Sequence, residues 1–185
     1  MDGLDDLERW AADARAREAA DARVRERWLR SQSEEEASLA GVLLALAERR
    51  QTVVVTTVGG RRHRGVVTGV GVDFAALEAP AGTTTLVALT GLADVRAVED
   101  GMRPRATAAG AGDDDRRGAF GVRLGDVLAQ AAGQRPRISL HAGAAPVVGD
   151  LRAMGSDVLT VRTDGGAVVY VGLASVSDIS FLASG

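Results

Sequence analysis

The feature that most constrains this chain is an internal repeat. The second half of the chain has the same features in the same order as the first half. A helical segment, a first strand, a glycine-bearing second strand and a last strand recur in the same order. In the second strands, Gly65 and Gly149 lie 84 positions apart, whereas the last strands match at 81, with Gly91 on Gly172 and Val95 on Val176. Four blocks in one order indicate a duplicated unit rather than chance.

Each copy of the repeat is expected to be a helix followed by an antiparallel meander. Apolar residues at helical spacing mark 34–49, and after Arg50 the pattern changes to β-branched strands separated by short glycine turns. Gly, Ala and charged residues without a period fill 101–118, which is typical of a solvated linker. We therefore predict a helical arm at 1–33, a first β unit with its leading helix at 34–100, a flexible linker at 101–118 and a second such unit at 119–183.

The repeated unit resembles the Sm and Sm-like family of small β-barrels, which have a short helix, a glycine within the bent second strand and another glycine near the end of the fourth. Gly65, Gly149, Gly91 and Gly172 carry this resemblance, and glycine allows both the strand bend and a close approach of backbones. The chain also looks like a family of uncharacterised actinobacterial proteins that carry two such units. The resemblance implies a mainly β fold with N-terminal helices, made of two tandem five-stranded barrels, each preceded by a helix.

The same resemblance implies RNA-binding or ring-forming ancestry, since the family binds single-stranded RNA between its two motifs. The family's base-reading Asn has no counterpart after Asp73 or Asp157, and Thr90 and Val171 stand where the family has Arg. We therefore carry over the fold and leave out the uridine pocket.

The basic run Arg61, Arg62, His63 and Arg64 is the candidate nucleic-acid contact, because a basic hairpin tip can hold phosphates without reading sequence. The competing interpretation is a solvated, charged turn, which the absence of interleaved aromatic residues favours. The second copy begins a different run at His141, so the feature is not shared.

The other candidate sites have plainer interpretations. Asp73 and Asp157 recur in equivalent places and are expected to cap turns, and the only two histidines, His63 and His141, are expected at the surface. Neither a catalytic triad nor a metal or cofactor site can be assembled from these residues. Trp10 and Trp28 are candidates for partner contact through the N-terminal helix, or for packing on the protein's own body.

Composition narrows the setting. The chain has no cysteine, which suggests a reducing compartment, and we expect a cytoplasmic protein without a secretory signal or a membrane span. A net charge of −3 argues against a broad basic surface for nucleic acid.

No nucleophile, base and orienting acid come together in the sequence, so we expect a protein that is not an enzyme. The first hypothesis is a non-catalytic, RNA-associated Sm-like module. The alternative is an oligomeric scaffold or adaptor that binds itself or another protein through sheet edges or the N-terminal helix. A contiguous positive face would favour RNA, and an apolar edge strand would favour a protein partner.

Overall fold

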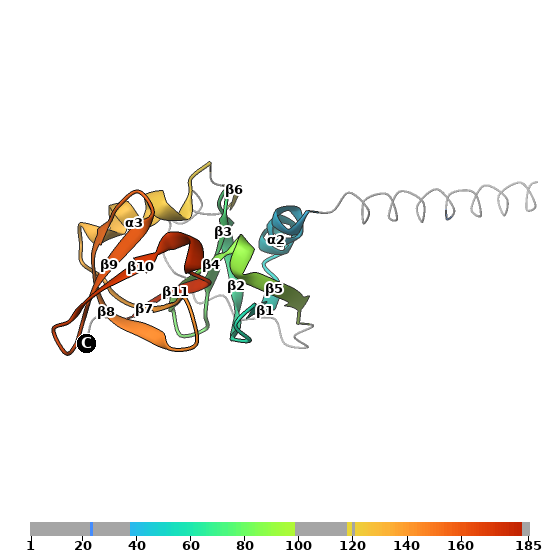
Figure 1. The fold of residues 1–185 in the computed structure, drawn as a ribbon. Helices are drawn as coiled ribbons and strands as arrows, with labels where there is room; N and C mark the ends of the chain where they lie inside the picture. The colour runs from blue at the N-terminus through green and yellow to red at the C-terminus, as the bar shows by residue number, and fades with distance from the viewer. Residues whose placement is uncertain (1–22, 24–37, 99–117, 120, 183–185) are drawn as a thin grey trace, which may run out of the picture. The chain divides into compact units, whose positions relative to one another are not determined.

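The computed structural model describes residues 23, 38–98, 118–119 and 121–182 (Figure 1). Residues from Leu39 onward form one compact unit. Of the predicted N-terminal arm, only Arg23 is described, and it is helical. Most of that arm and most of the predicted linker therefore lie outside the described residues, and the domain boundaries stay predictions.

The first half begins with a helix whose apolar face buries Leu43 and Leu46, as the helical spacing predicts. The first strand alternates part-buried and buried residues, because β-branched side chains on one face pack into the core, whereas β4 is buried along four consecutive residues. The elements are α2 (Leu39–Glu48), β1 (Thr52–Thr57), β2 (Arg62–Val70), β3 (Phe74–Glu78), β4 (Thr84–Ala88), the 3-10 turn η1 (Leu89–Gly91) and β5 (Leu92–Ala97).

The second half repeats this order after a short strand. Its helix starts where the Asp73 carboxylate accepts a hydrogen bond from the Leu124 backbone N–H at 2.7 Å, which satisfies a free amide of the first turn. The elements are β6 (Gly118–Ala119), α3 (Leu124–Ala132), β7 (Arg137–His141), β8 (Pro146–Met154), β9 (Val158–Thr163), β10 (Val168–Gly172), the 3-10 turn η3 (Leu173–Ser175) and β11 (Asp178–Phe181).

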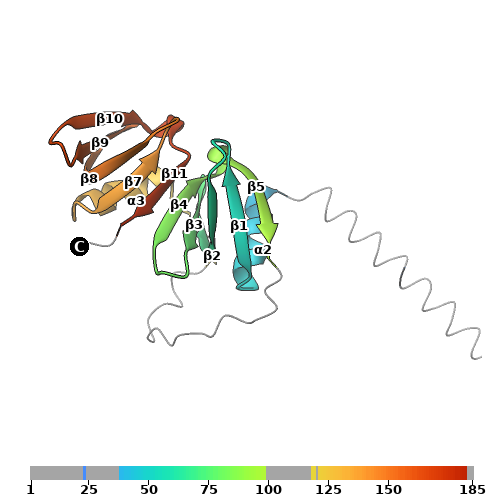
Figure 2. The same ribbon diagram turned by 90° about the horizontal axis from the view of Figure 1, so that it is seen from below.

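The strands form one continuous open sheet in the order β10-β9-β8-β7-β11-β4-β3-β2-β1-β5, and β6 pairs with β2 outside this line. Neighbours along the line are antiparallel, whereas β6 runs parallel to β2. Each half follows the same order of last, first, second, third and fourth strand. The halves join where β11 lies beside β4 (Figure 2).

The predicted pair of closed five-stranded barrels is therefore wrong, although the mainly β character is correct. Closing each barrel would require β4 to pair with β5 and β10 to pair with β11. Instead the outer edge of β4 is occupied by β11, and β10 and β5 lie at the two ends of the line. The hydrogen-bonding groups of β4 that closure needs are used to connect the two halves.

The structure also corrects the match between the last strands. Val95 pairs with Val55 in β1, and Ile179 pairs with Leu140 in β7, so Ile179 is the counterpart of Val95. The displacement is 84 residues, as in the second strands, and the match of Val95 with Val176 is wrong. Gly91 and Gly172 are not counterparts, so aligning them gave the wrong match. Gly91 is needed for another reason: a Cβ there would lie 2.7 Å from the Ser177 Cα, in the second half.

The close backbone approach predicted for the second-strand glycines is confirmed. A Cβ on Gly65 would clash with the Glu78 carbonyl group, and one on Gly149 would clash with the Arg162 carbonyl group. Both positions therefore need glycine for close backbone approach.

The apolar core has two clusters, one of which crosses between the halves. Phe74, Leu86 and Ala88 of the first half are buried together with second-half residues such as Leu140 and Ile179. This shared core makes the joint between the halves part of the protein interior.

Candidate functional site: a seam and two free edges

We call the contact between β4 and β11 the seam. It is a short ladder of three residue pairs, Asp178 with Val87, Ile179 with Leu86 and Ser180 with Thr85. On one face, Leu86 and Ile179 belong to the shared apolar core. On the other face, the Thr85 and Ser180 hydroxyl oxygens lie 2.9 Å apart and share a hydrogen bond. The seam thus has an apolar face and a second face, which we call the polar face, where the hydroxyl pair and Asp178 lie beside the buried Val87.

A buried carboxylate lies on the polar face. Asp178 is fully buried, and its Oδ2 accepts a hydrogen bond from the Ser177 hydroxyl at 2.9 Å. Its Oδ1 lies 3.1 Å from His141 Nδ1 and 3.2 Å from His63 Nε2. Arg61 Nε lies 3.6 Å from the same oxygen. We call these five residues the Asp178 cluster, in which groups from both halves compensate one buried charge.

The environment fixes the charge of this cluster. Burial alone raises the pKa of Asp178, but hydrogen bonds from His63 and Ser177 and the charges of the imidazoles outweigh it and hold that pKa below its usual value. Burial lowers the pKa of His141, Asp178 opposes this shift, and the nearby Arg61 guanidinium reinforces it. At neutral pH the carboxylate is therefore ionised and His141 is neutral.

The protonated nitrogen of neutral His141 is assigned to Nδ1, because that atom faces the carboxylate and must donate to it. Nε2 of the same ring is then bare, and it is buried without a hydrogen-bond partner in the described structure. Such an orphaned buried acceptor is rare in folded proteins.

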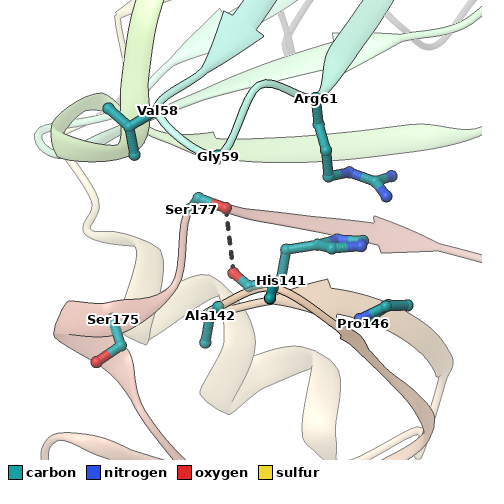
Figure 3. Close-up of a pocket in the computed structure, with 10 residues that line it drawn as sticks. Val58, Gly59, Arg61, His141, Ala142, Pro146, Ser175 and Ser177 are labelled. Carbon is teal, nitrogen blue, oxygen red and sulfur yellow. Dashed lines mark hydrogen bonds between the residues drawn. The ribbon is translucent and has the colours of Figure 1, made fainter.

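A cavity of about 420 Å³ lies beside the cluster, between the β1–β2 turn and the β7–β8 turn (Figure 3). The Arg61 and His141 side chains extend in the same direction along it. The Ser177 hydroxyl also approaches the His141 carbonyl oxygen at 3.2 Å, the dashed line in the figure. Because this hydroxyl contacts a carboxylate and a carbonyl group, its geometry is that of a structural bond and differs from the nucleophile–base contact of acyl transfer.

The predicted basic run is divided by the structure. Strand β2 starts at Arg62, so only Arg61 remains in the turn, and it faces Asp178. His63 has an 11 % exposed side chain in the same cluster, while Arg62 and Arg64 are exposed. A contact with RNA through these residues stays a prediction.

The expectation that both histidines lie at the surface is wrong. His141 is buried, and His63 is nearly so, because each imidazole turns toward Asp178. That carboxylate follows His63 by more than a hundred residues in the chain, so a search for an acid near each histidine in sequence misses it.

Asp73 caps the Leu124 amide, which begins α3 in the other half, rather than an amide of its own turn as expected. Asp157 instead accepts a hydrogen bond from the neighbouring Ser156 hydroxyl at 3.4 Å on the surface. Trp10 and Trp28, the predicted partner contacts, lie outside the described residues.

The outer edges of β10 and β5 end the line of strands, and we call them the free edges. On β10, Val168 is 51 % exposed and Tyr170 is 72 % exposed. On β5, the Arg96 guanidinium donates to the Asp94 carboxylate at 3.1 Å, which leaves a charged rim. The sequence reasoning missed Tyr170, whose signal was the lone aromatic residue in a run of valines.

Within the part of the chain that the structure describes, no helix has the length and apolarity needed to cross a membrane, and no three ligand-type side chains group as a metal site. No protein-family model matches the chain, and the search of curated proteins finds no relative, so the Sm-like resemblance rests on the sequence alone.

Proposed function

We propose that this protein is a non-catalytic assembly module that binds further copies of itself through its two free edges. The observation that carries the proposal is Tyr170. Its counterpart in the first half is Leu86, which is 4 % exposed because β11 covers it, whereas Tyr170 is 72 % exposed. A large apolar side chain at the outer edge of a sheet marks a surface that another strand can cover.

The second free edge is the complement that β10 needs. Strand β10 is the counterpart of β4, and β5 is the counterpart of β11, so the seam is an internal example of the contact that β10 of one chain would make with β5 of another. Applying the 84-residue displacement to the seam gives the register. Asp94 would pair with Val171, Val95 with Tyr170, and Arg96 with Val169.

The charged groups of β5 are compatible with this contact. Asp94 is the counterpart of Asp178, but its carboxylate is already bound to Arg96 at 3.1 Å and does not need donors from a partner. In the second half, Ala145 and Val147 occupy the places of Arg61 and His63. An intermolecular joint would therefore lack the Asp178 cluster and depend on main-chain hydrogen bonds and on burial of Val95 and Tyr170.

The two free edges are unlike each other, so this association is head to tail. Such an interface repeats from copy to copy, and it gives a ring when the rotation closes and a filament when it does not.

RNA association is the second candidate function, supported by exposed Arg62 and Arg64 on β2. It ranks lower because Arg61 and His63, half of the predicted basic run, face the Asp178 carboxylate. A phosphate would compete with that buried carboxylate for their charge.

The test is the molar mass of the purified chain by light scattering over a concentration series. We expect a multiple of the 19.1 kDa chain mass for the wild type. Tyr170→Lys should shift the mass toward a single chain, since it places a charge on the free edge of β10. Val72→Lys is the matched control, because Val72 is also exposed but lies in the β2–β3 turn. A wild-type chain that stays a monomer at hundreds of micromolar would overturn the proposal, and low-salt binding to labelled single-stranded RNA would then favour the second candidate.

A further inference from the structure

The polar face of the seam concentrates titratable groups that edge-to-edge assembly does not use. Both histidines of the chain approach one oxygen of Asp178, at 3.1 Å and 3.2 Å. They come from different halves, His63 from β2 and His141 from β7. The ladder that they flank has only three residue pairs. The strand ladder between the halves is therefore short and has an ionisable group at one end, and the shared core and the Asp73–Leu124 hydrogen bond also join the halves.

We propose that the Asp178 cluster is a proton-operated latch, which holds the seam closed at neutral pH and loosens it in mild acid while the strands within each half stay paired.

Burial of the imidazole, together with the nearby Arg61 guanidinium, explains why a proton would loosen the contact. Arg61 and His63 approach Asp178 from the first half, and His141 approaches it from β7. The seam residues of β4 are uncharged, and Ser177 contributes only a hydroxyl. A proton added to His141 puts a second cation beside Arg61 in a buried site with a single carboxylate. Separation of the polar face from the first-half hairpin would let water reach the charged imidazole and would also move it away from Arg61.

The direction of the pH effect follows from His141. Burial holds its pKa below the ordinary imidazole value of about 6.5, so an unfolded or opened chain binds the proton more readily than the closed one. The stability that neutral His141 provides is complete above that value and is lost as the pH falls below it. Asp178, with its own lowered pKa, stays ionised through this range.

Hydrogen exchange of single amides measures the latch directly. The Ala88 amide donates across the seam to the Ser177 carbonyl at 3.0 Å, whereas the Leu151 amide donates within the second half to the Pro136 carbonyl at 2.9 Å. Between pH 7.5 and 5.5, after correction for intrinsic exchange, we expect protection of Ala88 to fall about tenfold more than protection of Leu151. Equal losses at both amides would mean global unfolding and would overturn the latch.

A variant that keeps the hydrogen bonds but cannot titrate isolates the cause. In His63→Gln with His141→Asn, an amide nitrogen replaces His141 Nδ1 as the donor to Asp178, and a second amide replaces the His63 ring, whose Nε2 lies 3.2 Å from the same oxygen. We expect this double variant to lose the extra pH dependence of Ala88, and an unchanged dependence would contradict the proposal.

The wild type supplies an independent readout should that variant not fold. Because the chain has two histidines, only two imidazole signals appear in its NMR spectrum. His141 should titrate below the ordinary imidazole range, in step with Ala88 exchange. Titration at the ordinary value, with no accompanying change at Ala88, would rule the latch out.

Discussion

The joined and the free edges of this sheet are built from corresponding strands, yet they meet different surroundings. At the seam, Leu86 and Ile179 lie in a shared core. At the free edges their counterparts Tyr170 and Val95 are exposed and half-buried. Since the backbone pairing within each half is the same, the difference comes from whether another strand lies alongside. An exposed edge of this kind offers unpaired backbone groups with which another strand could pair.

The largest expected difference between the edges concerns the two aspartates. Asp178→Ala should lower the free energy of unfolding by about 3–5 kcal/mol, because it removes the acceptor of the His141 Nδ1 and Ser177 hydroxyl donors and the counter-charge of Arg61. Asp94→Ala, at the corresponding place on β5, should change it by less than about 0.5 kcal/mol, since its ion pair is exposed. Urea denaturation of the monomeric Tyr170→Lys background would measure both, and similar losses would remove the distinction between the edges.

The apolar positions should separate in the same way. Leu86→Ala should cost about 2–5 kcal/mol because it leaves a cavity in the shared core. Tyr170→Ala should cost under about 1 kcal/mol in a dilute, monomeric sample, where its side chain is exposed. Thermal unfolding followed by circular dichroism gives both values. If Tyr170→Ala lowered the stability of the monomer as much as Leu86→Ala, the free edge would be part of the chain's own core.

Disulfide cross-linking tests the proposed pairing of β10 with β5 at single residue pairs. The chain has no cysteine, so introduced pairs report without background. Thr85 and Ser180 have hydroxyl oxygens 2.9 Å apart, and their counterparts are Val169 and Arg96. A mixture of Val169→Cys and Arg96→Cys chains should form covalent dimers, whereas Val169→Cys with Thr160→Cys chains should not, because β9 is an inner strand. Readout is non-reducing electrophoresis, and absence of the first product would contradict the register.

The smallest expected effect is the dependence of stability on pH. His141 has a lowered pKa, so the unfolded chain takes up its proton first and stability should fall as the pH drops from 7.5 toward 5.5. The loss is at most about 1.4 kcal/mol for each unit by which the folded pKa lies below the unfolded one. Denaturation midpoints for the wild type and His141→Asn should converge at the acidic end. A midpoint that rose with acidification would show that His141 is stabilised in its charged form.

Local pattern was enough to predict the strands and the leading helices, because these features depend on neighbours in the chain. The need for glycine at Gly65 and Gly149 was predicted from their repeated place in the second strands, and it arises from the adjacent strand. The choice between a closed barrel and an open sheet depends on whether β4 bonds to β5 or to β11. Both strands offer the same backbone groups, so composition and period cannot distinguish them. The order of the strands in the sheet is therefore known only from the structure.

The site was less accessible to sequence reasoning than the fold. His63, His141 and Asp178 lie on three different strands, and no spacing rule relates them. Considered alone, the two histidines are expected at the surface, and nothing in the sequence singles out Asp178. The only signal in the sequence was that 185 residues contain just two histidines, one in each half, which allows both to contact one acidic residue.

The unlike ends of the sheet have a last consequence. A string of chains joined through β10 and β5 would have a direction, with one terminal subunit presenting β10 and the other presenting β5. A copy blocked at a single edge would therefore stop growth at one terminus and leave the opposite one active. In a closed ring, the number of subunits would be set by the angle at each joint, and concentration would decide only how many rings form.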